Sequence, residues 1–477
     1  MNQSDYLAHD AVGLADLIAR REASAAEVLE AALTRTEAVN PKLNAVTLLL
    51  ADEARAAVRA AASAQSLGGP LGGVPFLIKD LGVQVEGTAT TAGSRLLKDA
   101  IAARDSAIVA AWRRAGLVIF GKTNTPEFGL QPVTEPELFG PARNPWDLDR
   151  TPGGSSGGAA AAVGGGMVPA AHASDGGGSI RVPAACCGLF GLKPSRGRVS
   201  FAPADEGWGG LSIHHAVTRS VRDSAALLDA VCRPVAGDPY WLDPPARPFA
   251  EEVGREPGVL RIAFTTAALA SEGLDPQCAG AVREAAALCE SLGHRVEEAA
   301  LPGDLAAVGA AAGVVVAASL AATLDTEAAR RGRPIAEGEV EDATWGLYQS
   351  GRAISGSAYV QAIQAAHAFG RTVAAFFERY DGLLLSTLGR PPAPIGWLRG
   401  DPPDPHGYPK RLFAFMPNTQ AFNLTGQPAM TVPLAWSAEG LPIGVQFVGR
   451  PADEATLFRL AGQLERARPW AGRRAAL

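Results

Sequence analysis

Helix-like and strand-like segments alternate along this chain, and the alternation limits the folds it can adopt. Apolar residues at helical spacing over 105–115 lead into LVIFGKTN, a strand-like run. Residues 281–292 and the following HRVEEAALP repeat that order, and residues 453–466 read as a closing helix. Such alternation predicts an α/β fold in which helices cover a sheet.

Composition and charge exclude several classes of protein. The 477 residues are 47% hydrophobic and 19% charged, which fits a globular enzyme rather than a disordered or fibrous chain. A net charge of −6 leaves no basic excess to displace counterions from nucleic acid. Five cysteines match neither a disulfide framework nor a metal-ligand spacing. We therefore expect no nucleic-acid partner and no metal.

The sequence also favours a cytoplasmic location. The start, MNQSDYLAHDAVG, lacks the basic and apolar regions of a signal peptide. No apolar run approaches the ~18 residues of a membrane span, and the longest candidate, residues 305–324, is expected to form a buried helix. We expect no membrane association.

Two serines lie in glycine-dense loops. Ser155 belongs to PGGSSGG, and Ser179 follows Gly176, Gly177 and Gly178 in SDGGGSIR, after an apolar GGMVPAA that predicts a strand. Glycines let consecutive backbone N–H groups turn toward a ligand, and such donors stabilise a tetrahedral oxyanion. Losing one donor costs about 3 kcal/mol in known oxyanion holes. The second loop therefore suits a nucleophile, although a tight turn with an exposed serine also fits it.

Other uses of these glycines fit less well. The phosphate-binding string G-x-x-x-x-G-K-[ST] is absent, and matches to the dinucleotide fingerprint are partial. Ser155 does lie in a literal G-x-S-x-G, but the polar, proline-broken NPWDLDRTP precedes it. A hydrolase elbow needs a buried strand at that place, so the triad order of an α/β-hydrolase is disfavoured.

Lys79 ends an apolar run, VPFLIK, that predicts a strand. A lysine is a general base only when neutral, so its pKa of ~10.4 must fall by about three units to act near pH 7. That fall corresponds to about 4 kcal/mol of disfavour for the ammonium form. The apolar neighbours supply desolvation, and strand alternation places Asp80 on the opposite face. A solvated surface lysine is the plainer interpretation of Lys79 taken alone.

Three separated blocks, GGVPFLIKD, PGGSSGG and DGGGSIRVPAACCGLFGLKPSRGR, together resemble the amidase signature family. FNLTGQPAMTVPL and LPIGVQFVGR near the carboxyl end also look like that family. The resemblance implies the amidase signature fold, an α/β fold with a large twisted mixed β-sheet covered by helices on both faces. It implies one domain over residues 1–477, with a signature core at about 60–230 and a variable, substrate-shaping region at about 238–400.

The family's catalytic set falls on Lys79, Ser155 and Ser179. The resemblance implies that Ser179 is the nucleophile and that Ser155, after a cis Gly154–Ser155 bond, relays its proton to Lys79. An acyl-enzyme would form and be hydrolysed, so that an amide yields a carboxylic acid and an amine or ammonia. The N–H groups at 176–178 would form the oxyanion hole. Position 176 commonly holds a larger aliphatic residue or threonine in the family, and this chain has glycine there.

Five further residues are candidates around the triad. Asp175 and Arg181 flank the nucleophile loop and are predicted to support it, with an exposed ion pair as the alternative. Ser156 either binds the relay or caps the helix that follows it. Phe128 and Trp208 are candidate pocket walls, although an aromatic residue is more often plain core.

Within the family the blocks look most like amidases related to 6-aminohexanoate cyclic dimer hydrolase. That likeness implies a small-molecule substrate, a linear, cyclic or aryl amide, hydrolysed without a cofactor by a monomer or homodimer. A carbamate hydrolase with the same triad is one alternative. The glutaminase subunit of a tRNA-dependent amidotransferase is another, and it would act only with partner chains.

Overall fold

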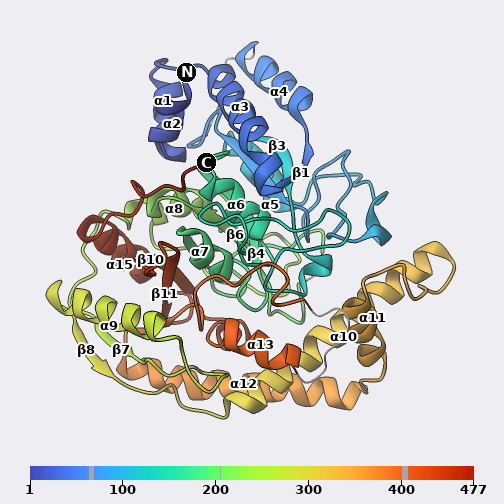
Figure 1. The fold of residues 1–477 in the computed structure, drawn as a ribbon, viewed down its shortest axis with the longest axis vertical. Coiled ribbons are helices and arrows are strands. Elements are labelled where there is room, and N and C mark those ends of the chain that lie inside the picture. Colours follow the sequence, from blue (N-terminus) through green and yellow to red (C-terminus); the bar gives the residue numbers. More distant parts are fainter. Residues whose placement is uncertain (64–68, 205, 400–406) are drawn as a thin grey trace.

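The computed structural model describes residues 1–63, 69–204, 206–399 and 407–477, and its strands join in one sheet (Figure 1). The sheet has 11 strands in the order β1-β3-β2-β4-β6-β5-β10-β11-β9-β7-β8. The strands are β1 (Val46–Leu49), β2 (Pro75–Lys79), β3 (Val118–Thr123), β4 (Ala170–Asp175), β5 (Phe190–Lys193), β6 (Ile213–Thr218), β7 (Arg261–Phe264), β8 (Arg295–Glu298), β9 (Gly382–Ser386), β10 (Ala429–Trp436) and β11 (Pro442–Gly449).

Helices of very different lengths surround this sheet. The described α-helices are α1 (Gln3–Ala8), α2 (Ala11–Ala19), α3 (Ala25–Leu43), α4 (Ala51–Ser63), α5 (Ala107–Arg114), α6 (Gly157–Gly164), α7 (Arg181–Cys187), α8 (Val221–Asp229), α9 (Pro276–Ser291), α10 (Leu305–Arg331), α11 (Asp342–Arg352), α12 (Gly356–Arg379), α13 (Gly407–Phe415), α14 (Ala421–Thr425) and α15 (Glu454–Ala467). Three short 3₁₀ turns, Arg95–Leu97, Glu127–Gly129 and Phe249–Glu251, complete the described helical elements.

The middle of the sheet is buried on both faces. Every residue of β2, β4, β5, β6 and β11 is buried. Successive side chains of a strand point to opposite faces, so both faces must be covered. Parallel pairs (β2 with β3 and β4) and antiparallel pairs (β4 with β6, β5 with β10) occur in the same sheet. The α/β fold with a mixed, helix-covered sheet is therefore confirmed.

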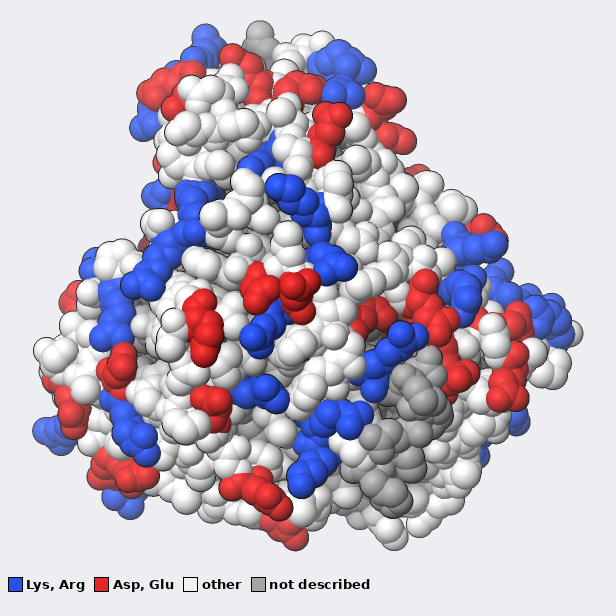
Figure 2. Space-filling view, in the orientation of Figure 1, with Lys and Arg blue, Asp and Glu red and all other residues white. Residues whose placement is uncertain are grey.

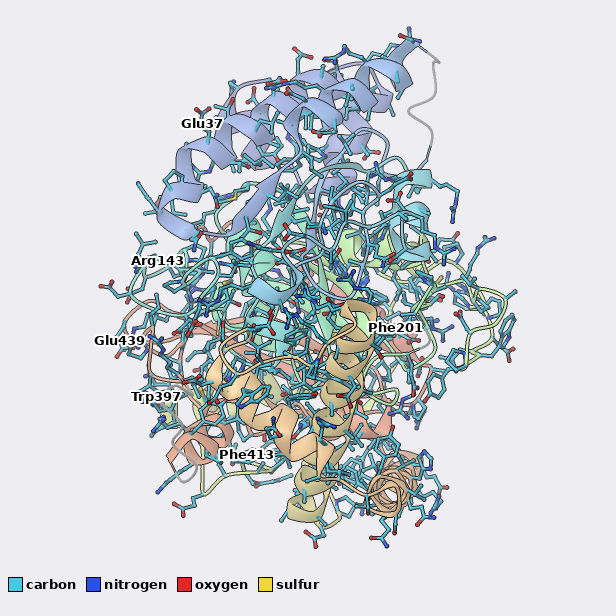
Figure 3. All side chains as sticks on the ribbon, turned by 90° about the vertical axis from the view of Figure 1, so that its right-hand side faces the viewer. Glu37, Arg143, Phe201, Trp397, Phe413 and Glu439 are labelled. Carbon is cyan, nitrogen blue, oxygen red and sulfur yellow. The ribbon has the colours of Figure 1, made fainter. Side chains whose placement is uncertain are left out.

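The helices form groups at opposite ends of the molecule. Figure 1 shows α1–α4 at one end and α10–α13 at the other, with α6 and α7 over the middle of the sheet. In the view turned by 90°, the N-terminal helices lie above and helices of the α10–α11 region cross the lower half (Figure 3). The carboxyl end returns to the N-terminal helices, where Arg474 donates to the carbonyl of Leu7.

The helix–strand units read from the sequence are present. α5 leads into β3, and α9 leads into β8, as the apolar spacing predicts. The closing helix is α15. The strand before the nucleophile loop differs from the prediction, because it begins at Ala170, after most of the apolar GGMVPAA run, and continues through His172 to Asp175. Burial in the middle of the sheet overrides the weak strand propensity of these polar residues.

The expectation that no apolar run approaches a membrane span was wrong for α10. This helix is long and apolar enough to cross a membrane, since an 18-residue window has a mean hydropathy of 2.2. Its sequence mixes alanines and glycines with valines and leucines. Residues along one side, including Val308, Val315 and Leu324, are buried, and 39% of the window is buried overall. The helix packs against α11 and α12.

The region predicted to be variable, about 238–400, contributes to the same sheet. Its strands β7, β8 and β9 form one end of the sheet, beside β11. The rest is mainly α9–α12, and residue 400 lies outside the described residues. The single-domain assignment and the substrate-shaping role of this region stay predictions.

Candidate active site

Lys79 is the last residue of β2 and lies in the interior of the protein. Its side chain is 0% exposed, and its Nζ lies 2.7 Å from the Ser155 Oγ and 3.0 Å from the Ser174 Oγ. β2 and β4 run parallel, which brings the carboxyl ends of both strands, and thus Lys79 and Ser174, to the same place. A lysine and two hydroxyl groups therefore form one buried cluster.

Burial lowers the pKa of Lys79 to about 7, while the nearby carboxylate of Asp175 acts to raise it. Removing the ammonium group from water disfavours the charged form more than this carboxylate favours it. Asp80 is not the partner, because its carboxylate binds the Lys122 Nζ at 3.2 Å and the Thr91 hydroxyl at 2.5 Å. Burial therefore favours the neutral amine form of Lys79 relative to an exposed lysine.

Ser155 and Ser156 lie at the start of α6. The Gly154–Ser155 peptide bond is cis, as the resemblance implies. Ser156 is the N-cap residue of α6, but it makes no side-chain capping bond. Instead its Oγ donates to the carbonyl of Ser174 at 3.2 Å and accepts from the Ser174 N–H at 3.3 Å. The expected cap is not formed, and a contact of Ser156 with the relay groups Ser155 and Lys79 stays a prediction.

Ser179 follows β4 in a tight loop and is half-buried. Gly178 in that loop has φ of +145°, which favours glycine, and an added Cβ would lie 2.4 Å from the Thr419 Oγ1. The carboxylate of Asp175 accepts from the N–H of Ile180 at 3.1 Å, across the loop. The loop is thereby held on both sides. The Ser179–Ser155 contact and the oxyanion role of Gly176, Gly177 and Gly178 stay predictions.

Asp175 and Arg181 form a two-point ion pair beneath this loop. Two guanidinium nitrogens lie 2.9 Å from the two carboxylate oxygens, and both side chains are 0% exposed. The expected alternative, an exposed pair, is therefore excluded. Burial acts to raise the pKa of Asp175, but the Arg181 charge and hydrogen bonds hold it well below its usual range.

Arg181 also connects the loop to the C-terminal part of the chain. It donates to the carbonyl of Thr419 at 2.9 Å, to Gln446 at 2.7 Å and to the Asn423 Oδ1 at 2.5 Å. Asn423 in turn donates to the Asp175 carboxylate at 2.8 Å. Every charge in the network is compensated, so it can orient the loop without an uncompensated buried ion.

Trp208 packs against the nucleophile loop at the position where this chain departs from the family. A Cβ on Gly176 would lie 2.7 Å from the Trp208 ring and 2.7 Å from the Ser212 Oγ. Glycine at 176 therefore makes room for the indole. Trp208 adopts a positive φ of 52°. Its role as a pocket wall stays a prediction.

Phe128 lies in a buried turn close to Ser155. It has a φ of 49° and is 7% exposed. A Cβ on the next residue, Gly129, would lie 3.2 Å from the Ser155 Oγ. The turn is thus next to the relay serine, and the contact of Phe128 with a substrate stays a prediction.

Sequence reasoning missed several residues of this site. The hydroxyl of Ser174 contacts the Lys79 Nζ, but the sequence predicted the loop and not a strand at Ser174. The alternation Ala-His-Ala-Ser-Asp is the sequence pattern that could have indicated a strand there. Residues after α13 also face the loop. A Cβ added to Gly177 would lie about 4 Å from the side chains of Met416 and Gln420. The FNLTGQ block carries Asn423, but nothing in the block indicates a partner some 250 residues away.

Other titratable groups near Lys79 do not provide a base. His172 Nδ1 accepts from the Lys79 backbone N–H at 3.2 Å, and its Nε2 lies 3.2 Å from His214 Nδ1. Burial lowers the pKa of His172 well below its usual value and that of His214 to about 3, so both stay neutral. Among the described residues, no group of three His, Cys, Asp or Glu side chains is placed to hold a metal.

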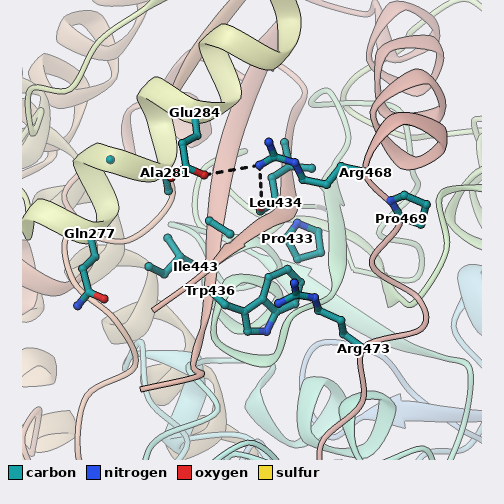
Figure 4. Close-up of a pocket in the computed structure, with 12 residues that line it drawn as sticks. Gln277, Ala281, Glu284, Pro433, Leu434, Trp436, Ile443, Arg468, Pro469 and Arg473 are labelled. Carbon is teal, nitrogen blue, oxygen red and sulfur yellow. Dashed lines mark hydrogen bonds and ion pairs between the residues drawn. The ribbon is translucent and has the colours of Figure 1, made fainter. Parts of the chain in front are cut away.

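One cavity of the protein lies away from these residues. Figure 4 shows a cavity of about 560 Å³ between α9, β10 and the C-terminal segment, lined by residues such as Glu284, Trp436 and Arg468. None of Lys79, Ser155, Ser174 or Ser179 lines it. The lysine–serine cluster at the ends of β2 and β4 is therefore separate from this cavity.

The α/β fold and the comparisons with known proteins define a hydrolytic enzyme. The amidase family model matches residues 27–458, and the chain belongs to this family. It is an amidase, an enzyme that hydrolyses amide C–N bonds.

Named relatives cover almost the whole chain. A 6-aminohexanoate-cyclic-dimer hydrolase of Paenarthrobacter ureafaciens is 38% identical over 98% of this chain and 96% of the relative. A solved 6-aminohexanoate cyclic dimer hydrolase structure has a TM-score of 0.92 at 37% identity and covers 98% of this chain and 99% of its own. A bacterial aryl acylamidase of the amidase signature family has a TM-score of 0.88 at 28% identity, with coverage of 98% and 99%.

Proposed function

We propose that this amidase works through a Lys79–Ser155–Ser179 triad and an acyl-enzyme. The observation that carries the proposal is the Lys79 Nζ, fully buried and 2.7 Å from the Ser155 Oγ. Its pKa of about 7 makes a neutral amine available as a base at physiological pH. Ser179, at the end of a glycine loop, is half-buried, whereas Lys79 and Ser155 are buried.

The proposed reaction proceeds in two halves. The Ser179 Oγ attacks the amide carbonyl carbon, its proton moves to the Ser155 Oγ, and the Ser155 proton moves to the neutral Lys79 Nζ. The reverse transfer protonates the leaving nitrogen, the C–N bond breaks and an ester to Ser179 remains. Water then attacks that ester by the same relay, which releases a carboxylic acid and restores Ser179. The loop N–H groups at 176–178 would stabilise the oxyanion in both halves.

The surroundings of the loop favour an uncharged substrate. The side chains that approach Gly176, Gly177 and Gly178 most closely are not ionisable: Trp208, Ser212, Met416, Thr419, Gln420 and Val182. The charges of Asp175 and Arg181 compensate one another. Together with the named relatives, this supports a neutral linear, cyclic or aryl amide, with the cyclic dimer of 6-aminohexanoate as the first compound to test.

The triad can be tested by labelling and turnover. A fluorophosphonate should add to Ser179, as located by peptide mass spectrometry, and Ser179→Ala should lower anilide turnover by roughly 10⁴-fold. An adduct on Ser155 in the wild-type protein would contradict the assignment. A fully active Ser179→Ala protein would contradict it too.

The substrate can be tested on the isolated chain with matched amide, cyclic amide, anilide and carbamate compounds. Amide turnover without added proteins is expected. Turnover confined to carbamates would make the chain a urethane hydrolase. Glutamine hydrolysis that required partner subunits would instead favour the amidotransferase subunit.

A further inference from the structure

A small pocket lined by arginines lies at the carboxyl end of the chain, between α1, α3 and the end of α6. Its volume is about 240 Å³, and Arg35, Arg219, Arg473 and Arg474 line it together with apolar residues. No Asp or Glu side chain is among the lining residues. Figure 2 shows Lys and Arg side chains gathered below the N-terminal helices, near the carboxyl end labelled in Figure 1.

Backbone carbonyls at helix ends fix these arginines in place. Arg35 Nε donates to the carbonyl of Gly165, just after α6, at 2.9 Å. Arg219 Nη1 donates to the carbonyl of Leu7 in the last turn of α1 at 2.9 Å, and Arg474 donates to the same carbonyl. Such carbonyls lack partners within their helix. These bonds use only some of the five N–H donors of each guanidinium.

Among the described residues, three arginines of this pocket have no Asp or Glu ion-pair partner, although the charges of Asp223 and Asp10 act on Arg219. In the described parts of the chain, neither Arg35, Arg219 nor Arg474 has a carboxylate within 4 Å, whereas the nearby Arg222 pairs with Asp10 at 2.6 Å. Asp10 and Asp223 are the acidic neighbours of Arg219. The Asp223 carboxylate accepts a hydrogen bond from the backbone N–H of Ala11, at the start of α2, at 2.8 Å.

Burial makes this imbalance costly. Desolvation lowers the pKa of Arg35 and of Arg219, and the Arg219 Nε is buried without a hydrogen-bond partner. Partial burial, with repulsion from Arg219 and Arg35, lowers the pKa of Arg474 to about 10. Partly desolvated cations that repel one another are favourable only where an anion compensates them.

Arg473 lines both this pocket and the neighbouring cavity, and its side chain packs on an aromatic ring. Its guanidinium carbon lies 4.2 Å from the centre of the Trp436 ring, as Figure 4 shows. In that cavity Arg468 faces Glu284 at 3.7 Å, so its charge is balanced. Arg35, Arg219 and Arg474 are the arginines of the first cavity that have neither an ion pair nor an aromatic ring as partner in the described residues, and we call that cavity the arginine pocket.

We infer that the arginine pocket binds a small oxyanion, a carboxylate or phosphate group on a compact apolar body. A guanidinium presents a planar fork of donors that matches two oxygens of such a group. The apolar part of the ligand would contact Trp146, Val163 and Leu189, which line the same pocket. This inference is independent of the proposed triad.

Calorimetric titration of the full chain with hexanoate and, separately, with inorganic phosphate tests this site. Saturable binding with one site per chain is expected for at least one of them. Arg35→Gln and Arg474→Gln should each weaken it at least tenfold. Arg59→Gln, which removes the same charge from an exposed position on α4, should leave it unchanged. Circular dichroism of each variant would confirm that it is folded.

Three results would overturn the inference. One is the absence of saturable binding of either anion to the folded wild-type chain. A second is equal binding by the Arg35, Arg474 and Arg59 variants, which would show only general attraction to a basic surface. The third is binding of several anions per chain with similar affinity, because the arginine pocket, at about 240 Å³, accounts for one.

Discussion

At the scale of single residues, the proposed chemistry requires a neutral Lys79. Burial disfavours its ammonium form, and Asp175 opposes that effect. The sequence predicts both the desolvation and the turning away of Asp80, because alternation along a strand is local information. The sequence does not predict how far Asp175 lies from Lys79, because the pairing of β2 with β4 determines that distance.

Activity should follow the titration of Lys79. Only the neutral amine accepts the Ser155 proton, so kcat/KM should rise about tenfold per pH unit below pH 7 and level off above it. Lys193 is a suitable control, because burial also lowers its pKa to about 7 although it does not contact the serines. The Lys193→Met variant should keep the midpoint of the profile. A midpoint that disappears with Lys193 would show that Lys79 does not set it.

Ser174 should support Lys79 without reacting itself. Its Oγ lies 3.0 Å from the Lys79 Nζ, and a hydrogen bond of this kind contributes about 1–1.5 kcal/mol. Ser174→Ala should therefore lower kcat about tenfold and leave KM nearly unchanged. Ser174→Thr, which keeps the hydroxyl, should restore most of the rate. Equal losses in both variants would indicate a packing effect instead.

At the scale of elements, the site lies where β2, β4 and the start of α6 meet. The sequence predicts β2 and the glycine loops well, because apolar runs and glycine clusters are strong local signals. It misplaces the end of β4, since Ser174 and Asp175 favour loops by propensity and only burial between β2 and β6 makes them strand. The contact of Trp208 with Gly176 is equally invisible in the sequence, because it joins two loops.

This contact predicts a coupling between Gly176 and Trp208. Gly176→Ala should displace the indole, because the new Cβ would lie 2.7 Å from it, and should change relative kcat/KM for bulky and small amides. Trp208→Leu should remove the clash, so the double variant should be more active than Gly176→Ala. The non-additive part is expected to be about 1–2 kcal/mol in ΔΔG‡. Strict additivity would show that the two side chains do not interact.

At the scale of the whole molecule, the C-terminal part completes a site whose chemistry lies in the first half of the chain. Thr419, Asn423 and Gln446 bind Arg181, and Met416 and Gln420 approach the nucleophile loop. The strand order places β5 beside β10, and this pairing joins the two parts. A single sequence contains no signal for such long-range pairing, and family resemblance gives the fold without these partners.

The Asp175–Arg181 pair should therefore affect the stability of the whole protein. Asp175→Asn leaves Arg181 buried without its counter-charge, so the free energy of unfolding at pH 7 should fall by about 3–5 kcal/mol. The native pKa of Asp175 is held below its unfolded value, so this stabilisation is present above about pH 4 and is lost as the pH falls.

Urea denaturation of both proteins between pH 7 and pH 2.5 measures this effect. The stability difference between wild type and Asp175→Asn should be constant from pH 7 to about pH 5, then shrink by about 1.4 kcal/mol per pH unit below pH 4. Asp149→Asn is the matched control, because its exposed carboxylate lies 3.9 Å from Arg143 and should contribute little at any pH. A difference for Asp175→Asn that persists unchanged at pH 2.5 would mean that the lost stability came from altered packing rather than from the buried charge.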